Sequence, residues 1–184
     1  HRTRHRERGT TRAQLCRASP PARAQALRRH ALYEALQERF HRADPAVWGW
    51  QAWPEPYRDP AGEAAARFAA EQLERVEFYE YLQWQAERQL ARAAERCAAL
   101  GMALGLYLDL AVSVDRAGSD AWAAQDVYAL GASVGAPPDD FNLKGQDWGL
   151  PPLRPDSLRA TRYALYIAAL REAMADRKST PLNS

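Results

Sequence analysis

The sequence has few of the residues that build metal sites and disulfide frameworks. Its 184 residues include only two cysteines, Cys16 and Cys97, and all four histidines lie within residues 1–41. Two isolated cysteines provide neither a Cys-x-x-Cys metal motif nor the repeated pairing of a disulfide scaffold. We therefore predict no metal site and no cofactor, and the cysteine usage favours a reducing, cytoplasmic location.

Long apolar runs and lysines are also scarce. No run of eighteen apolar residues occurs, so we predict no membrane-spanning helix. Two lysines stand against twenty-three arginines, and nine of these arginines lie in residues 1–30 beside a single glutamate. This basic segment lacks aromatic side chains for base stacking. We interpret it as part of a chain-wide preference for arginine and predict no nucleic-acid and no membrane partner; no pattern indicates an oligomeric state.

Apolar residues are plentiful, at 47% hydrophobic composition, and in several segments they recur every three or four residues. That spacing is typical of helices with one buried face. The longest such pattern stops at Gly101, and glycine suits the left-handed turn after a helix. The predicted helices cover 22–40, 63–100, a short stretch from Ser119 or Asp120 to Leu130, and a last one from Asp156 or Ser157 to Met174.

The two ends of the chain differ from its middle. Residues 1–22 are polar and arginine-rich, and residues 177–184 show no periodicity after an abrupt change of composition. We expect both ends to be disordered and a single domain to cover 23–176. The chain begins with histidine rather than methionine, and its last eight residues are predicted to be non-native.

Residues 103–114 change to a period of two. Leucine and valine alternate there with small or polar residues, which predicts a strand. Asp109 lies late in this strand, on the small and polar side. In a barrel of parallel strands a carboxylate at that position points toward the active site; alternatively, Asp109 pairs with an arginine or caps a turn.

The segment 47–60 contains three tryptophans and three prolines in fourteen residues. Such a stiff, irregular segment has two interpretations. We favour the one in which the indole rings anchor the segment to the core. The alternative is a platform on which a sugar or a base stacks.

The loop from Gly135 to Pro152 contains four prolines and three glycines, which exclude an ordinary helix or a central strand. It also carries Phe141 and Trp148 among aspartate, asparagine and glutamine side chains. Aromatic faces stack on the C–H faces of a sugar, and carboxylates and amides bind its hydroxyls. A sugar site is one interpretation, and a surface loop pinned by two buried aromatic residues is the other.

Four blocks carry a resemblance to a known family. They are Trp50–Pro60 (WQAWPEPYRDP), Val76–Trp84 (VEFYEYLQW), Gly105–Val112 (GLYLDLAV) and Val134–Pro152 (VGAPPDDFNLKGQDWGLPP). In this order they resemble the 4-α-glucanotransferases, also called amylomaltases or disproportionating enzymes. The resemblance implies an α/β fold, a partial (β/α)8 barrel with helical insertions. It also implies transfer of α-1,4-glucan segments between maltooligosaccharides by a retaining double displacement.

The resemblance also implies roles for individual residues. Its motif positions make Asp139, Gln146 and Trp148 sugar contacts, with Asn142 and Phe141 beside them on the same loop. By the same resemblance Asp109 is the strand-end carboxylate near the site, so the substrate-binding candidates are Asp139, Gln146, Trp148, Asn142, Phe141 and Asp109.

The family's catalytic motif Arg-Ile-Asp-His, whose aspartate is the nucleophile, does not occur in this sequence. We therefore expect a fragment that is itself inactive, that contains no catalytic residue, and that leaves apolar surface open when isolated. Two alternatives from other classes are a non-catalytic carbohydrate-binding module and an arginine-rich helical interaction protein.

Overall fold

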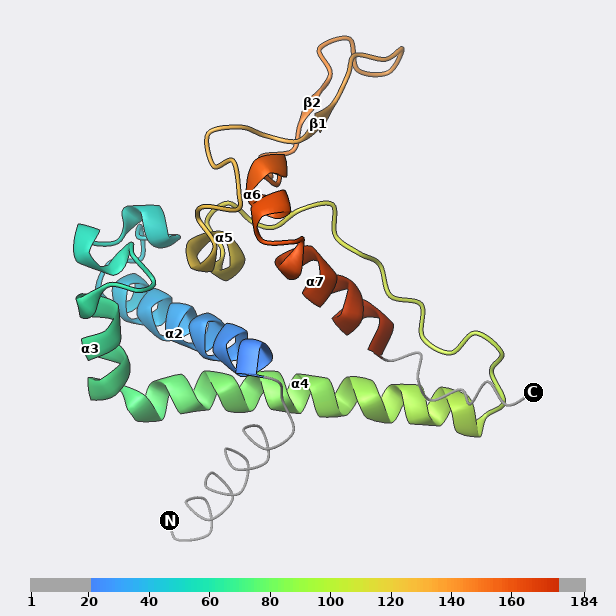
Figure 1. The fold of residues 1–184 in the computed structure, drawn as a ribbon, viewed down its shortest axis with the longest axis horizontal. Helices are drawn as coiled ribbons and strands as arrows, with labels where there is room; N and C mark the ends of the chain where they lie inside the picture. The colour runs from blue at the N-terminus through green and yellow to red at the C-terminus, as the bar shows by residue number, and fades with distance from the viewer. Residues whose placement is uncertain (1–20, 176–184) are drawn as a thin grey trace, which may run out of the picture. The chain divides into compact units, whose positions relative to one another are not determined.

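The computed structural model describes residues 21–175. The disorder predicted for 1–22 is wrong for residues 21 and 22, which are helical, and for the rest it lies, like that predicted for 177–184, outside the described residues. The described chain forms two compact units, 21–84 with 115–125 and 85–114 with 126–175. Most of it is helical, as predicted (Figure 1). The elements are α2 (Pro21–Ala43), η1 (Trp50–Ala52), η2 (Glu55–Tyr57), α3 (Glu63–Glu71), α4 (Leu73–Ala99), α5 (Ser119–Ala123), β1 (Gly135–Ala136), β2 (Gln146–Asp147), α6 (Pro155–Ala160) and α7 (Ala164–Ala175).

The core of the first unit is built on the inner face of α2. Ala31, Leu32 and Leu36 are buried and follow the three- and four-residue spacing of the predicted stripe. The helix packs against α5, and the Tyr33 hydroxyl donates to the Ala117 carbonyl at 2.5 Å. The helix predicted over 22–40 is thus confirmed.

Trp53 lies at the centre of this core and is 0% exposed. Its ring centroid lies 5.1 Å from that of Tyr33, 5.7 Å from Phe40 and 5.8 Å from Trp122. Tilted and edge-on aromatic pairs at such separations add to the free energy gained by burial. The core of the first unit is therefore an aromatic cluster whose side chains come from α2, the segment 47–60 and α5.

A buried amide fixes the backbone around this cluster. Gln37 Oε1 accepts hydrogen bonds from Trp53 Nε1 at 3.0 Å and from the Gly49 N–H at 3.1 Å. Gln37 Nε2 donates to the Val47 carbonyl at 3.3 Å. One side chain on α2 thus satisfies polar groups at three points of the following segment, which a buried amide needs in order to be tolerated.

The anchoring predicted for the segment 47–60 holds for two of its three tryptophans. Trp50 is buried and donates from Nε1 to the Arg116 carbonyl at 3.1 Å, and Trp53 is in the core. Trp48, by contrast, is 69% exposed. The anchor interpretation is wrong for that residue.

The single helix predicted over 63–100 is two helices. The interruption is at Gln72, whose φ of −111° and ψ of 34° are not helical. Its N–H donates to the Phe68 carbonyl at 2.8 Å, and its own carbonyl accepts from the Val76 N–H at 3.1 Å. One residue thus ends α3 and begins α4, and both Phe68 and Val76 are buried.

The end of α4 follows the prediction. Gly101 has a φ of 70°, in the left-handed region that glycine tolerates. The Met102 N–H donates to the Cys97 carbonyl at 3.1 Å and the Gly101 N–H to the Ala98 carbonyl at 3.0 Å. These two bonds form a Schellman motif and satisfy carbonyls that the last helical turn leaves open.

The strand predicted over 103–114 is wrong for the described structure. That segment has no regular secondary structure. A strand needs a neighbour to pair with its N–H and C=O groups, and no described strand pairs with this segment. The alternating pattern indicates a segment suited to a sheet, but it does not indicate whether neighbouring strands are present to pair with it.

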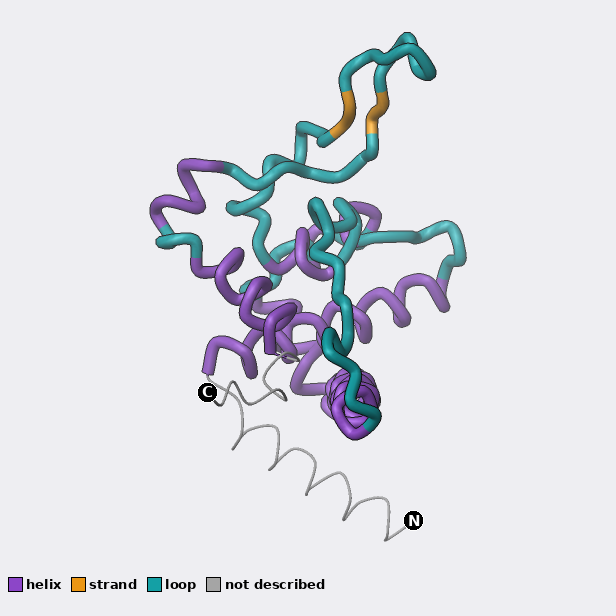
Figure 2. Tube along the Cα trace, turned by 90° about the vertical axis from the view of Figure 1, so that its right-hand side faces the viewer, coloured by secondary structure: helices purple, strands orange, loops and turns teal. Residues whose placement is uncertain are grey.

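The second unit contains instead a short antiparallel pair, β1 with β2, in which Gly135 faces Asp147 and Ala136 faces Gln146. Figure 2 shows these strands at the base of a long loop.

The short helix predicted from Ser119 or Asp120 to Leu130 is α5 of the first unit. It ends at Ala123, earlier than predicted.

The predicted last helix is divided into α6 and α7. Arg162 and Tyr163 separate them, with φ values of 52° and 59° that no α-helix accommodates. The first of the two helices begins with Pro155 at its first turn, where proline costs no hydrogen bond. Across residues 21–175, no helix combines the length and the apolarity needed to cross a membrane.

Candidate functional site

The candidate site is the hairpin formed by 135–147, and two glycines explain why its arms lie so close. A Cβ on Gly135 would come within 1.9 Å of the Gln146 carbonyl oxygen. Gly145 has a φ of 72°, and a Cβ there would lie 2.7 Å from the Ala136 oxygen. Any side chain at either position would force the arms apart, so the sequence selects glycine at both.

Hydrogen bonds fix the base of the hairpin. The Trp148 N–H donates to the Val134 carbonyl at 3.0 Å, and the Val134 N–H donates to the Leu150 carbonyl at 2.8 Å. Asp147 Oδ1 accepts from the Ser133 hydroxyl and from the Gly149 N–H. The base is thus held by both backbone and side-chain bonds.

The tip of the hairpin is a preformed turn centred on Asp139. Its Oδ1 accepts from the Phe141 N–H at 2.9 Å and from the Asn142 N–H at 2.6 Å, and its own N–H donates to the Asn142 carbonyl at 3.1 Å. Such an Asx turn orders a loop from within. Among the described residues nothing hydrogen-bonds to the second oxygen, Oδ2, so this oxygen can accept from a ligand.

Trp148 and Gln146 point the same way, as residues two apart in an extended chain do. Trp148 Nε1 donates to Gln146 Oε1 at 2.8 Å, and the indole is 44% exposed. The bond fixes the orientation of the amide, so that its Nε2 is left to donate elsewhere. The pair therefore presents an aromatic face beside an oriented hydrogen-bond donor.

Phe141 is fully exposed at the tip, and Trp148 is exposed by nearly half. The interpretation of this loop as one pinned by two buried aromatic residues is therefore wrong. Asn142 is half-buried, and its Oδ1 accepts from the Lys144 N–H at 3.3 Å. Four of the five candidates of the loop thus lie on the hairpin, and Trp148 follows it directly at its base.

Asp109, the sixth candidate, is not brought to the hairpin. It is exposed on the irregular segment 103–114, and no hydrogen bond or ion pair is formed by it within the described part of the chain. Because the predicted strand is not formed, the strand-end geometry that would aim this carboxylate at a site is missing.

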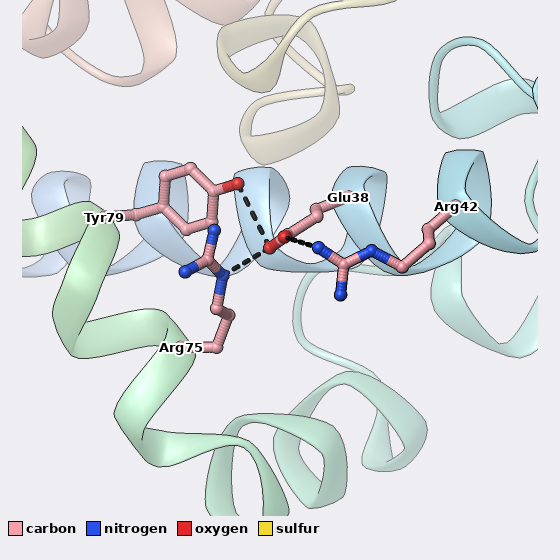
Figure 3. A network of polar contacts seen from close by, with 4 residues as sticks. All are labelled: Glu38, Arg42, Arg75 and Tyr79. Carbon is pink, nitrogen blue, oxygen red and sulfur yellow. Dashed lines mark hydrogen bonds and ion pairs between the residues drawn. The ribbon is translucent and has the colours of Figure 1, made fainter.

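Sequence reasoning missed a polar cluster in the first unit (Figure 3). Glu38 on α2 accepts from Arg75 Nε and from the Tyr79 hydroxyl, the latter at 3.2 Å, and pairs with Arg42 at 2.6 Å. Burial alone would raise the pKa of Glu38, but the hydrogen bond and charge of Arg75, with smaller effects of Tyr79 and Arg42, lower it. The spacing of Glu38 and Arg42 by four could have indicated one of these contacts; the contacts with α4 have no local signal.

A second missed contact joins His30 to Ser119, with 2.9 Å between Nδ1 and Oγ. The amide Nε2 of Gln83 lies 2.9 Å from His30 Nε2. An amide N–H only donates, so His30 Nε2 accepts and the ring proton sits on Nδ1. His30 then donates to Ser119 and cannot act as its base, so this contact joins α2, α4 and α5 without forming a nucleophile.

Comparison with known proteins assigns the chain to a family. A family model described as 4-alpha-glucanotransferase, glycoside hydrolase family 77, matches residues 2–178. The chain therefore belongs to the 4-alpha-glucanotransferase family, and the resemblance in the four sequence blocks is confirmed.

The chain is 44% identical over 164 residues to a 4-alpha-glucanotransferase of Mycobacterium tuberculosis (strain ATCC 25618 / H37Rv), which covers 81% of the chain and 23% of that protein. It is 37% identical over 136 residues to one of Haemophilus influenzae, covering 73% of the chain and 20% of that protein. The chain thus spans less than a quarter of the length of these relatives.

Among solved structures, an amylomaltase from Streptococcus agalactiae in complex with acarbose is similar with a TM-score of 0.70 and 19% identity. The match covers 84% of this chain and 31% of that one. At this identity the likeness shows the fold alone. The described residues therefore fold as a part of an amylomaltase does, with helices and one small sheet.

Proposed function

We propose that this chain is a glucan-binding part of a 4-α-glucanotransferase that transfers α-1,4-glucan segments between maltooligosaccharides. The observation that carries the proposal is the hairpin, which holds Trp148 exposed and hydrogen-bonded to Gln146 on a backbone that two glycines and an Asx turn make rigid. Membership of the family supports the class of substrate. A cytoplasmic location belongs to the proposal and rests on the cysteine usage.

Each candidate has a definite task in this proposal. The C–H face of a glucosyl ring stacks on the Trp148 indole, and Gln146 Nε2 donates to a ring hydroxyl. Asp139 Oδ2 accepts from a second hydroxyl, and such charge-assisted bonds are among the stronger ones. Asn142 and Phe141 flank the sugar from the tip of the hairpin.

Asp109 joins the site only if residues 103–114 become a strand. The alternating pattern of that segment suits a strand flanked on both sides, as in a (β/α)8 barrel. We propose that further strands of the longer protein supply these neighbours. In this proposal the barrel forms only in the complete enzyme, where neighbouring strands provide hydrogen-bond partners for this segment.

Catalysis belongs to other parts of the enzyme in this proposal. A retaining glycosyl transfer needs a nucleophilic carboxylate and a carboxylic acid about 5–5.5 Å apart. On the hairpin, Asp139 and Asp147 each use Oδ1 in internal hydrogen bonds, which commits one oxygen of each carboxylate to the loop itself. This chain supplies binding groups, and we expect it to transfer no glucan when incubated alone with maltotriose.

The test is a titration of the 184-residue chain with maltoheptaose, followed by calorimetry. Stacking on one aromatic side chain is worth roughly 1–3 kcal/mol, so Trp148→Ala should weaken binding by about tenfold or more. Leu143→Ala is the matched control, because Leu143 is exposed on the same tip and has no task in the proposal. Equal affinities for the chain and for Trp148→Ala would refute this placement of the site.

A further inference from the structure

Trp48 is an exposed indole in the first unit that the proposed site does not use. It is 69% exposed, whereas Trp50 and Trp53, which follow it in the same segment, are buried. Both of those residues donate from their indole N–H to a protein oxygen. The indole N–H of Trp48 has no acceptor among the described residues. Folding alone gives no reason for a tryptophan at this position, since the anchoring is done by its neighbours.

The exposure of Trp48 is enforced by the backbone on both sides of it. The Val47 carbonyl and the Gly49 N–H are both bonded to the side chain of Gln37. Gly49 has a φ of 83°, and a Cβ at that position would come within 2.6 Å of the Ala117 Cβ. The loop is therefore clamped on either side of the indole, which stands out from a fixed backbone.

Two polar side chains lie at or next to Trp48, those of His41 and Gln51. The His41 ring lies edge-on to it, with 5.4 Å between ring centroids and an interplanar angle of 82°. His41 Nδ1 donates to the Val47 carbonyl at 3.2 Å, so in the tautomer with this proton Nε2 is an acceptor. The amide of Gln51 donates from Nε2 to the Arg116 carbonyl at 2.9 Å, and its Oε1 lies beside Gly49, the residue that follows Trp48, so a second acceptor is present there.

One aromatic face among hydrogen-bond acceptors suits a sugar better than a protein partner. Protein interfaces draw their affinity from aromatic residues inside a wider, desolvated patch, whereas the ring that lies against Trp48 is the polar imidazole of His41. A glucosyl ring offers an apolar C–H face for the indole and hydroxyl donors for His41 Nε2 and Gln51 Oε1.

We propose that Trp48, with His41 and Gln51, forms a second α-1,4-glucan contact point, built by the first unit and independent of the hairpin. The ligand class rests on the proposed function of the chain, while the site itself rests on the exposure, the clamp and the acceptors. A transferase whose substrates are long glucans gains a second place to hold them.

Indole N–H signals of the uniformly 15N-labelled chain test this. The Trp48 and Trp148 signals are assigned from Trp48→Phe and Trp148→Phe, and the chain is then titrated with maltoheptaose. We expect both signals to shift, each with its own apparent Kd. A shift of Trp148 alone overturns this inference and leaves the proposed function standing; a shift of Trp48 alone supports the inference and refutes the hairpin site. Shifts of neither overturn both.

Variants separate sugar binding from other causes of a shift. Trp48→Ala should abolish the remaining glucan-dependent changes around His41 and leave the Trp148 shift unchanged. His41→Ala should weaken the Trp48 site several-fold, because it removes an acceptor and the ring that holds the indole. Tyr81→Ala is the matched control, since Tyr81 is an exposed aromatic residue of the same unit, and it should change nothing.

A further arm addresses protein partners. If the Trp48 signal moves or broadens with increasing protein concentration and not with maltoheptaose, the indole contacts a second copy of the chain, and the glucan assignment is overturned. Equal shifts with cellobiose, whose linkage is β, at the same concentration would likewise overturn the assignment to α-1,4-glucans.

Discussion

The aromatic segment 47–60 and the hairpin 135–147 are both rigid, but they are made rigid in opposite ways. In the first, a buried amide, Gln37, and two buried indoles hold the backbone from the inside. In the second, glycines and an internal turn hold the backbone, and the aromatic side chains lie outside. Aromatic residues next to prolines thus indicate a stiff segment, and only the core beside it decides whether the rings are anchors or contacts.

The largest effect should come from removing an anchor. Trp53→Ala leaves a cavity at the centre of the aromatic cluster, and truncating a buried aromatic costs about 3–5 kcal/mol. Chemical denaturation followed by circular dichroism measures the loss. Trp148→Ala, which removes an indole that is 44% exposed, should cost less than about 1 kcal/mol. Similar losses in the two variants would abolish the distinction between anchor and contact.

A smaller effect should follow from removing the buried amide. Gln37→Leu keeps the size of the side chain but leaves Trp53 Nε1 and the Gly49 N–H without their acceptor. An unsatisfied buried donor costs roughly 1–3 kcal/mol, and the same denaturation experiment reports it. Gln51→Leu is the control, since that amide is exposed. A Gln37→Leu protein as stable as the parent would mean that the clamp does not hold the segment.

For the hairpin the corresponding change is Gly135→Ala. The added methyl would lie 1.9 Å from the Gln146 oxygen, so the arms must separate, and the Trp148–Gln146 pair should lose its fixed geometry. We expect weaker maltoheptaose binding, by about tenfold, with the stability of the first unit unchanged. Gly131→Ala is the matched control, because a Cβ there meets nothing within 4 Å. Unchanged binding in Gly135→Ala would show that hairpin geometry does not matter for the sugar.

The smallest effect concerns acid stability of the first unit. The pKa of Glu38 is lowered in the folded chain, so its contribution to stability is present above the ordinary carboxyl range and is lost as pH falls through the folded pKa. The partner Arg42 is largely exposed and Arg75 is partly exposed, which limits this contribution to about 1 kcal/mol or less. Glu38→Gln should flatten the acid side of the stability profile, with Glu55→Gln as control. A profile of unchanged slope would contradict the pKa direction.

Local rules could predict the elements whose cause is local. The buried face of α2 and the glycine that ends α4 could be predicted from the sequence, because periodicity and a left-handed turn are properties of short stretches. The strand predicted over 103–114 is not formed in the described structure, because a strand needs partner strands, which a local pattern does not reveal. The family and the non-helical character of the loop 135–152 followed from the sequence, but the pairing of β1 with β2 did not. The roles of the six candidate residues stay predictions.

The two glutamines show the same limit. Gln83 lies on the face of α4 that also carries Val76 and Tyr79, yet it is exposed. Gln37 is the buried one, although nothing around it in the sequence distinguishes it. A stripe becomes a buried face only where another element covers it, and most of the stripe beyond Tyr79 is exposed in the described structure.

The clamp made by Gln37 also restricts the length of the chain that follows it. Its amide reaches Val47, Gly49 and Trp53 at once, so the spacing between α2 and these three groups is fixed to the residue. An inserted or deleted residue between 44 and 47 would displace all three partners together, while many substitutions at the exposed positions there would displace none. In this part of the family, related chains should therefore vary in the identity of these loop residues long before they vary in their number.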